Sequence, residues 1–133
     1  MNKLQKTYMI TRLHLDALIS LQDELEKKYI SDKGIVNTDG SVPKHLWCMD
    51  DDAEFEKANE EFEALIVANG LEKELNEARD RLKSAENELI AFGLSLAPDN
   101  IRATLEKAVQ QNALTREKVL NLTFNLDTST LKG

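Results

Sequence analysis

The chain has little cysteine and no long apolar run, and each scarcity excludes a class of protein. Its single cysteine, Cys48, rules out an internal disulfide and favours a reducing compartment, so we expect a cytoplasmic protein. No apolar run approaches the roughly eighteen residues that cross a bilayer, and residues 1–6 open no signal-peptide core. We therefore expect neither export by that route nor a membrane protein.

Motifs for catalysis and phosphate binding are also missing, because the sequence has no glycine-rich phosphate loop, nucleophile elbow or metal-binding helix motif. Asp50, Asp52, Glu54 and Glu56 alternate as in a calcium loop, but Phe55 stands where that loop needs glycine. The pattern favours helix capping and solvation over calcium binding.

A zinc site or a cysteine nucleophile would have to use Cys48 with His45 or His14. A zinc site lacks a fourth strong ligand, and the surrounding acids disfavour the thiolate that a nucleophile requires. We expect a protein that is not an enzyme and has no cofactor and no metal.

Aromatic residues make up only 5% of the 133 residues, whereas leucine, alanine and isoleucine recur throughout. This composition favours a single, mainly α domain over residues 1–133, built as a helical bundle. The predicted elements are a helix over 3–30, a small β-hairpin or ordered loop over 31–50, helices over 51–69, 71–93 and 98–112, and an extended strand or short helix over 115–127.

Two of these elements leave alternatives open. The first helix could instead begin at Ala17 with Asp16 as its cap, although the apolar spacing from Leu4 to Tyr29 favours the longer helix. In the last element, leucine and phenylalanine alternate with polar residues, which favours a C-terminal strand over a helix.

The middle of the chain predicts a long antiparallel helical hairpin, with a turn at Asn69-Gly70-Leu71. The heptad after this turn is the most regular in the sequence and includes Leu75, Leu82 and Leu89. Such a seam has more apolar length than one short chain easily covers, so self-association as a homodimer is a hypothesis.

Trp47, the single tryptophan, lies in the segment 43–49 before the second predicted helix. We expect it to plug one end of the helical core, because a large ring is usually buried. Exposure of Trp47 would instead mark a contact site.

What the chain has in excess is negative charge. Between Asp50 and Glu88 it carries fourteen acidic and five basic residues, a net charge of −9, against −7 for the whole chain. Such a run is most often a solubilising face, but it can also occupy a basic surface of a partner. The candidate partner-binding residues are Asp51, Glu54, Glu60, Glu61, Glu63, Glu72, Glu74 and Glu77.

The sequence therefore favours a non-enzymatic protein-binding module whose partner is a protein with a basic surface evolved for nucleic acid. In composition alone the chain resembles the small acidic helical inhibitors made by bacteriophages, and this resemblance assigns no residue a role. The alternative is a structural coiled-coil component whose heptads drive homo-oligomerisation. Direct nucleic-acid binding through Arg102, Lys107, Arg116 and Lys118 is a weaker option, because the chain as a whole is acidic.

Overall fold

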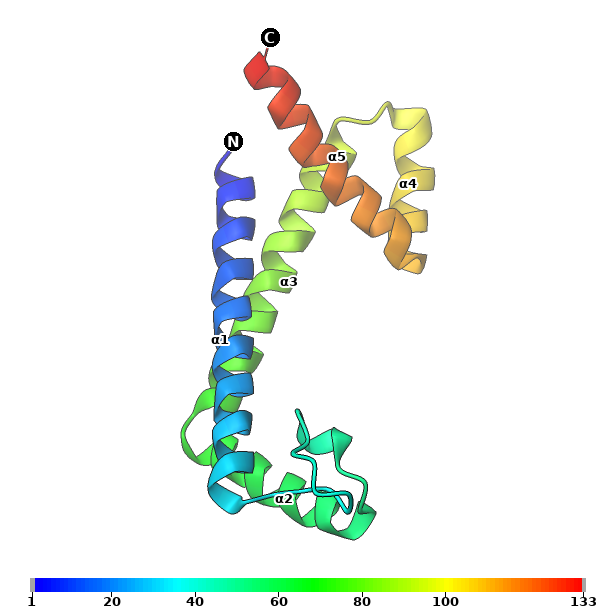
Figure 1. Cartoon of the computed structure of the whole chain (residues 1–133). Helices are drawn as coiled ribbons and strands as arrows, with labels where there is room; N and C mark the ends of the chain where they lie inside the picture. The colour runs from blue at the N-terminus through cyan, green and yellow to red at the C-terminus, as the bar shows by residue number, and fades with distance from the viewer. Residues whose placement is uncertain (1, 133) are drawn as a thin grey trace. The chain divides into compact units, whose positions relative to one another are not determined.

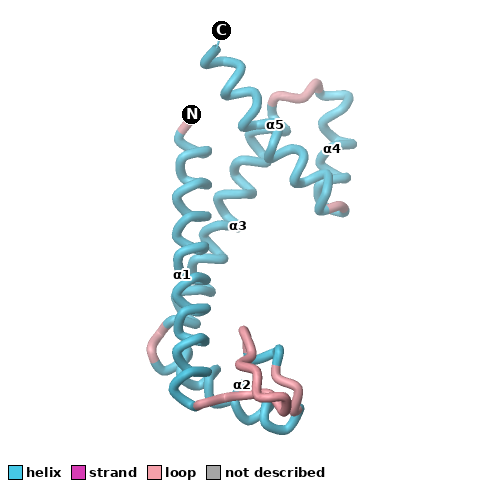
Figure 2. Tube along the Cα trace, in the orientation of Figure 1, coloured by secondary structure: helices cyan, strands magenta, loops and turns pink. Residues whose placement is uncertain are grey.

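The computed structural model describes the backbone of residues 2–132 and the side chains of residues 2–124. Within that range the chain is mainly helical, which confirms the predicted fold class (Figure 1). The helices are α1 (Lys3–Lys33), the short 3-10 helix η1 (Leu46–Cys48), α2 (Asp52–Ala68), α3 (Leu71–Ser95), α4 (Asp99–Gln111) and α5 (Ala113–Lys132). Figure 2 shows helices and loops but no strand in this range.

The chain divides into two compact units. Unit 1 contains the described residues up to Leu13 and from Arg79 onward, and unit 2 contains His14–Ala78. Whether the chain is a single domain over residues 1–133 stays a prediction.

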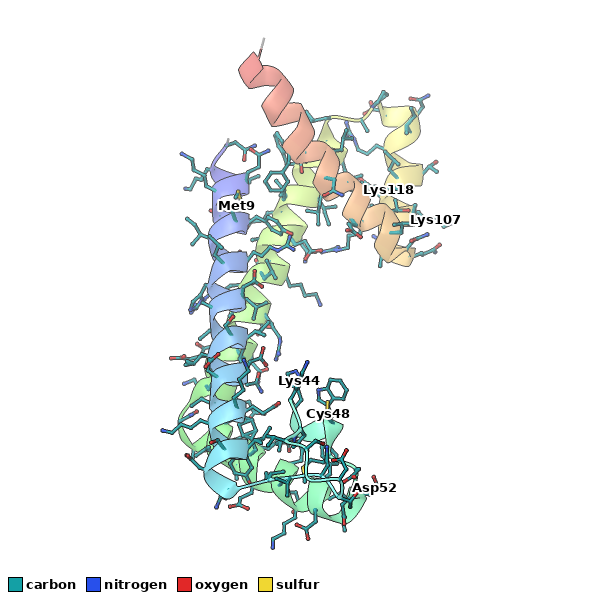
Figure 3. All side chains as sticks on the ribbon, in the orientation of Figure 1. Met9, Lys44, Cys48, Asp52, Lys107 and Lys118 are labelled. Atoms are coloured by element: carbon teal, nitrogen blue, oxygen red, sulfur yellow. The ribbon has the colours of Figure 1, made fainter. Side chains whose placement is uncertain are left out.

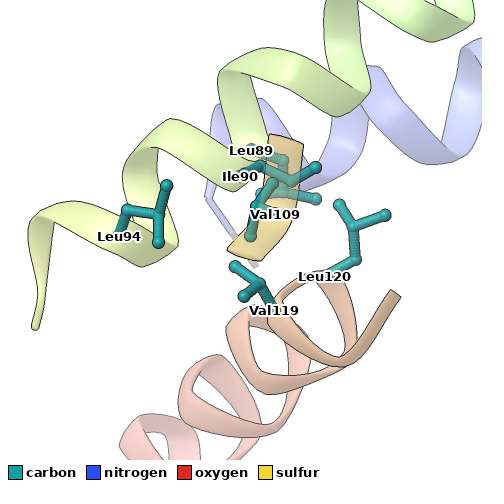
Figure 4. Packing of buried hydrophobic residues seen from close by; sticks show 6 residues of the cluster. All are labelled: Leu89, Ile90, Leu94, Val109, Val119 and Leu120. Carbon is teal, nitrogen blue, oxygen red and sulfur yellow. The ribbon is translucent and has the colours of Figure 1, made fainter. Parts of the chain in front are cut away.

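Unit 1 has a core built from three helices. Leu89 of α3 is fully buried, and aliphatic side chains of α4 and α5 surround it (Figure 4). The buried cluster consists of Leu89, Ile90, Leu94, Val109, Val119 and Leu120, and Leu4, Tyr8, Leu105 and Phe124 pack against it. From α1, the buried Gln5 donates its side-chain amide to the Thr123 carbonyl at 3.0 Å.

For 115–127 the preferred strand is wrong and the helix alternative is confirmed, because this segment belongs to α5. Among the described side chains of α5, Val119, Leu120 and Thr123 are buried, and they follow helical spacing. Leu122 belongs to the alternating pattern that favours a strand, yet it is 52% exposed on the far side of the helix. The alternation is a coincidence of sequence that packing on α3 and α4 overrides.

Gly93 lies at a close approach between α3 and α5. A Cβ atom at this position would stand 2.8 Å from the Thr123 Cγ2 and 3.1 Å from the Val119 Cγ1. Both distances are shorter than ordinary van der Waals contact, so glycine lets the two helices pack as they do.

Unit 2 packs the second half of α1 against α2 and the first turns of α3. The rings of Tyr29 and Phe62 lie 5.6 Å apart between centroids. The buried apolar residues of this unit are Leu15, Leu18, Tyr29, Ile30, Leu46, Ala58, Phe62, Ile66, Leu71, Leu75 and Ala78. Because α1 begins at Lys3, the longer first helix is confirmed and the alternative start at Ala17 is wrong.

The turn between α2 and α3 is as predicted, but the long antiparallel hairpin is not confirmed. Gly70 has φ of +81°, and the Asn69 side chain accepts a hydrogen bond from the Leu71 amide at 3.0 Å. The apolar face of α2 has another neighbour, since Phe62 packs on Tyr29 of α1.

The segment between α1 and α2 is an ordered loop, so the β-hairpin alternative is wrong. Its tight turn is closed by the Asn37 amide, which donates to the Ser41 carbonyl at 2.8 Å. Asp50 fastens the far end of the loop, because its carboxylate accepts hydrogen bonds from the amide and hydroxyl of Thr38. Side-chain bonds replace the strand ladder here, which leaves the loop fixed without a sheet.

Candidate protein-docking surface

All eight predicted partner-binding acids lie in unit 2, and all are exposed. Five stand on α2 or at its N-cap, and Glu72, Glu74 and Glu77 follow in the first turns of α3. We refer to Asp51, Glu54, Glu60, Glu61, Glu63, Glu72, Glu74 and Glu77 together as the acidic surface.

Helix geometry explains why the acids of α2 face water. Ala58, Phe62 and Ile66 recur every four residues and are buried on one face of α2. The intervening positions, including Glu60 and Glu63, are therefore turned outward. Asp51 is the N-cap, and its carboxylate accepts a hydrogen bond from the Glu54 amide at 3.0 Å.

One acid of this surface is compensated by a lysine of α1. Glu61 Oε1 lies 2.9 Å from Lys33 Nζ. This ion pair lowers the pKa of Glu61 and raises the pKa of Lys33, while burial and then the Glu61 carboxylate raise the pKa of Tyr29. Within the described residues, no cation lies within 4 Å of Glu54, Glu60, Glu63, Glu72 or Glu74. Most of the negative charge is thus left to solvent or to a partner.

Trp47 is not a core plug, since it is 73% exposed. Its neighbour Leu46 is 3% exposed and fills the place that the sequence assigned to the indole. The one-turn helix η1 turns consecutive side chains in different directions, so burying Leu46 turns Trp47 outward. Trp47 is therefore a candidate contact residue.

Two residues hold Trp47 in place. The His45 imidazole stacks on the indole with centroids 5.4 Å apart and planes 7° from parallel. Glu26 of α1 accepts hydrogen bonds from His45 Nδ1 at 2.8 Å and from the Leu46 amide at 3.3 Å. We call Trp47 and His45 the aromatic platform.

The platform adjoins a shallow cleft of about 570 Å³ between the end of α1 and the loop. Its lining residues are Asp23, Lys27, Ile30, Ser31, Val42, Pro43, Lys44 and His45. Lys44 and Cys48 of the loop and Asp52 at the start of α2 all belong to unit 2 (Figure 3). A shallow cleft beside an exposed ring suits a macromolecular partner better than a small ligand.

Sequence reasoning missed Glu26 and the stacking of His45 on Trp47. A signal for Glu26 was present, because it lies among the apolar positions of α1 that face the core. Its side chain is 16% exposed. A charged residue on a buried face needs a specific partner, although the sequence does not show which one.

The heptad leucines are covered by their own chain. Leu75 is buried in unit 2, Leu89 is buried in unit 1, and Leu82 is half-buried. A second copy would reach Leu75 or Leu89 only after repacking. The homodimer stays a prediction.

Two of the arginines considered for nucleic-acid binding are engaged inside unit 1. The Arg102 guanidinium donates to the Leu94, Ser95 and Ala97 carbonyls at the end of α3. Arg116 Nε donates to Glu86 Oε1 at 2.8 Å. Lys107 and Lys118 are exposed on α4 and α5 (Figure 3).

Among the described residues there is no group of three or more histidine, cysteine, aspartate and glutamate side chains placed to hold a metal ion. None of the helices in the described range is long and apolar enough to cross a membrane.

The chain matches no known family model, and it has no match among curated proteins or solved structures.

Proposed function

We propose that this chain is a non-enzymatic docking protein that places its acidic surface on the basic surface of a protein partner. A basic surface evolved for nucleic acid suits it best, and by occupying that surface the chain would act as an inhibitor. The observation that carries the proposal is the exposure of all eight acids on one compact unit, five of them with no cation within 4 Å among the described residues.

The physical basis is electrostatic complementarity. A concentrated negative field speeds encounter with a positive surface and selects against acidic proteins. Exposed charges of this kind contribute mainly to association rate and specificity, so the complex should be salt-sensitive. The exposed Trp47 adds an apolar anchor of the kind that carries much of the affinity in protein interfaces.

A matched pair of triple variants tests the proposal. Glu60, Glu63 and Glu74 are changed to lysine in one variant, and the exposed Glu88, Glu106 and Glu117 of unit 1 are changed to lysine in the control. Both variants change the net charge equally. Partner capture from the native cell and binding of an oligo-lysine peptide are measured at low salt, with circular dichroism to verify helicity.

We expect the unit 2 variant to bind at least about tenfold more weakly and the control to lose much less. Equal losses would mean that net charge alone matters, and the acidic surface would then not be the site.

The rival proposal, a structural component that assembles through its heptads, gives the opposite pattern. Under that proposal the charge variants leave assembly unchanged, and Leu82→Asp breaks an oligomer. Leu82 is the suitable position because it is half-buried, whereas a charge at Leu75 or Leu89 would disrupt a core. Sedimentation of the wild type and of this variant separates the two proposals.

A further inference from the structure

The loop before α2 holds a large apolar ring in water by a set of specific bonds. Trp47 is 73% exposed, although indole is among the side chains that gain most from burial. A single exposed apolar residue needs no explanation. Trp47 does need one, because it stands on a segment that several hydrogen bonds and a ring stack hold in place.

The segment that carries Trp47 is held by specific contacts. His45 stacks on it, and Glu26 in turn holds His45 and the Leu46 amide. The 3-10 turn is closed by the Cys48 and Met49 amides, which donate to the His45 and Leu46 carbonyls at 3.0 Å. Since Leu46 is buried beneath, the indole is positioned before any partner arrives, which reduces the entropy lost on binding.

The charge around the platform indicates the partner's chemistry. Unit 2 contains seventeen acidic and six basic residues, a net charge of −11, so cationic segments concentrate near it. Indole is the best aromatic acceptor for a cation. A guanidinium is planar and weakly hydrated and stacks on a ring, whereas an ammonium is compact and strongly hydrated. The indole offers such a flat face, and the His45 ring stacks on it with the two planes 7° from parallel.

We propose that the platform of Trp47 and His45 binds an arginine side chain of the basic protein partner by stacking on the exposed indole. This rests on the proposed function, since the acidic surface attracts the segment that carries the arginine. The platform adds a preference that charge alone does not give, namely arginine over lysine.

The full chain is titrated with an oligo-arginine peptide and an oligo-lysine peptide of equal length and charge. Because Trp47 is the single tryptophan, its emission reports directly on the platform. We expect the wild type to bind the arginine peptide about three- to tenfold more tightly, with a change in Trp47 emission that the lysine peptide does not produce.

Variants at the platform test whether Trp47 causes the preference for arginine over lysine. Trp47→Leu should bind both peptides equally, and Trp47→Phe should retain part of the preference because a phenyl ring is a weaker acceptor. Leu114→Ala serves as the control, since it shortens an exposed apolar side chain of unit 1. Thermal unfolding verifies that each variant folds.

The outcomes distinguish this inference from the proposed function. If both peptides bind equally and Trp47→Leu changes nothing, the arginine platform is wrong and the acidic docking surface survives. If neither peptide binds the wild type, both the arginine platform and the acidic docking surface are wrong. If Trp47 emission depends on protein concentration without peptide, a second copy occupies the platform and the inference is overturned.

Discussion

The two units of this chain carry net charges of opposite sign. Unit 2 has a net charge of −11, whereas the remaining sequence holds seven acids and eleven bases, a net charge of +4. All five arginines belong to unit 1, and Arg102 and Arg116 tie its helices together. The glutamates of unit 2 mostly extend into water. Arg102 and Arg116 therefore support the fold of unit 1, whereas most of the acidic surface of unit 2 is exposed to solvent.

This difference matters because like charges on a compact unit repel one another and oppose folding. Unit 2 tolerates the repulsion because its apolar face is well covered, with Phe62 and Leu71 both nearly inaccessible. An excess of exposed negative charge that the fold does not need agrees with the proposed binding of a basic partner.

The largest expected effect comes from the core of unit 1, where Leu89 is 0% exposed. Leu89→Ala should lower the free energy of unfolding by about 3–5 kcal/mol, because it leaves a cavity that α4 and α5 close only partly. Denaturant titration measures the change. Leu122→Ala, on the exposed side of α5, should cost less than about 0.5 kcal/mol. Similar losses for the two variants would contradict the core described for unit 1.

The next effect concerns the close contact of α3 with α5. Gly93→Ala should destabilise the chain by about 1–3 kcal/mol, because the new methyl group overlaps the Thr123 side chain. The better helix propensity of alanine offsets part of this cost. Ser84→Ala, at an exposed position of the same helix, serves as the control and should be neutral in thermal unfolding. A stabilised Gly93→Ala would show that the two helices are not packed this closely.

Salt should affect the two units differently. Raising the salt concentration from about 50 to 500 mM screens the repulsion in unit 2. The free energy of opening that hydrogen exchange reports for the α2 amides should therefore rise by up to about 1 kcal/mol. The α5 amides should change less, because unit 1 is closer to neutral. Hydrogen exchange followed by residue measures both helices in one sample. Equal changes in α2 and α5 would mean that the charge difference has no energetic consequence.

The smallest expected effect is that of Glu61→Gln, because the ion pair with Lys33 is exposed. The folded pKa of Glu61 is lowered, so its contribution is present above the unfolded pKa of about 4.3 and is lost as the pH falls further. The folded pKa of Lys33 is raised, so its contribution is lost only as the pH rises above about 10.4.

The melting temperature of the wild type should therefore lie slightly above that of Glu61→Gln between about pH 5 and 10, and this difference should vanish at lower pH. Melting temperatures across this range measure it. Glu60→Gln is the control, since Glu60 has no cation within 4 Å in the described chain, and it should show no such loss at low pH. A constant difference down to about pH 3 would show that Glu61 acts other than through its charge.

The helices could be predicted from the sequence because their signals are local. Leucines at steps of three and four mark a buried face, and Gly70 supplies the positive φ that ends α2. The exposure of the acids follows from the same periodicity, since they stand between the buried positions of α2. The sequence could thus predict that the eight residues of the acidic surface are exposed, while their role in binding stays a prediction.

Errors arose where a local pattern had two solutions. The segment 115–127 alternates like a strand, but α3 and α4 provide a core that a helical face fits better, so Leu120 is buried and Leu122 is exposed. Likewise, the sequence favoured burial of the larger Trp47 in the segment before α2, but the structure buries its neighbour Leu46 instead.

By itself, the sequence determined where α1 to α4 lie, where the chain turns and which segment is acidic, because periodicity, capping and charge are properties of neighbouring residues. Tertiary structure alone decided that Trp47 is exposed, that Glu26 holds His45, and that Arg102 and Arg116 are engaged. These outcomes depend on which side chains arrive from distant parts of the chain, and burial is settled only when they do.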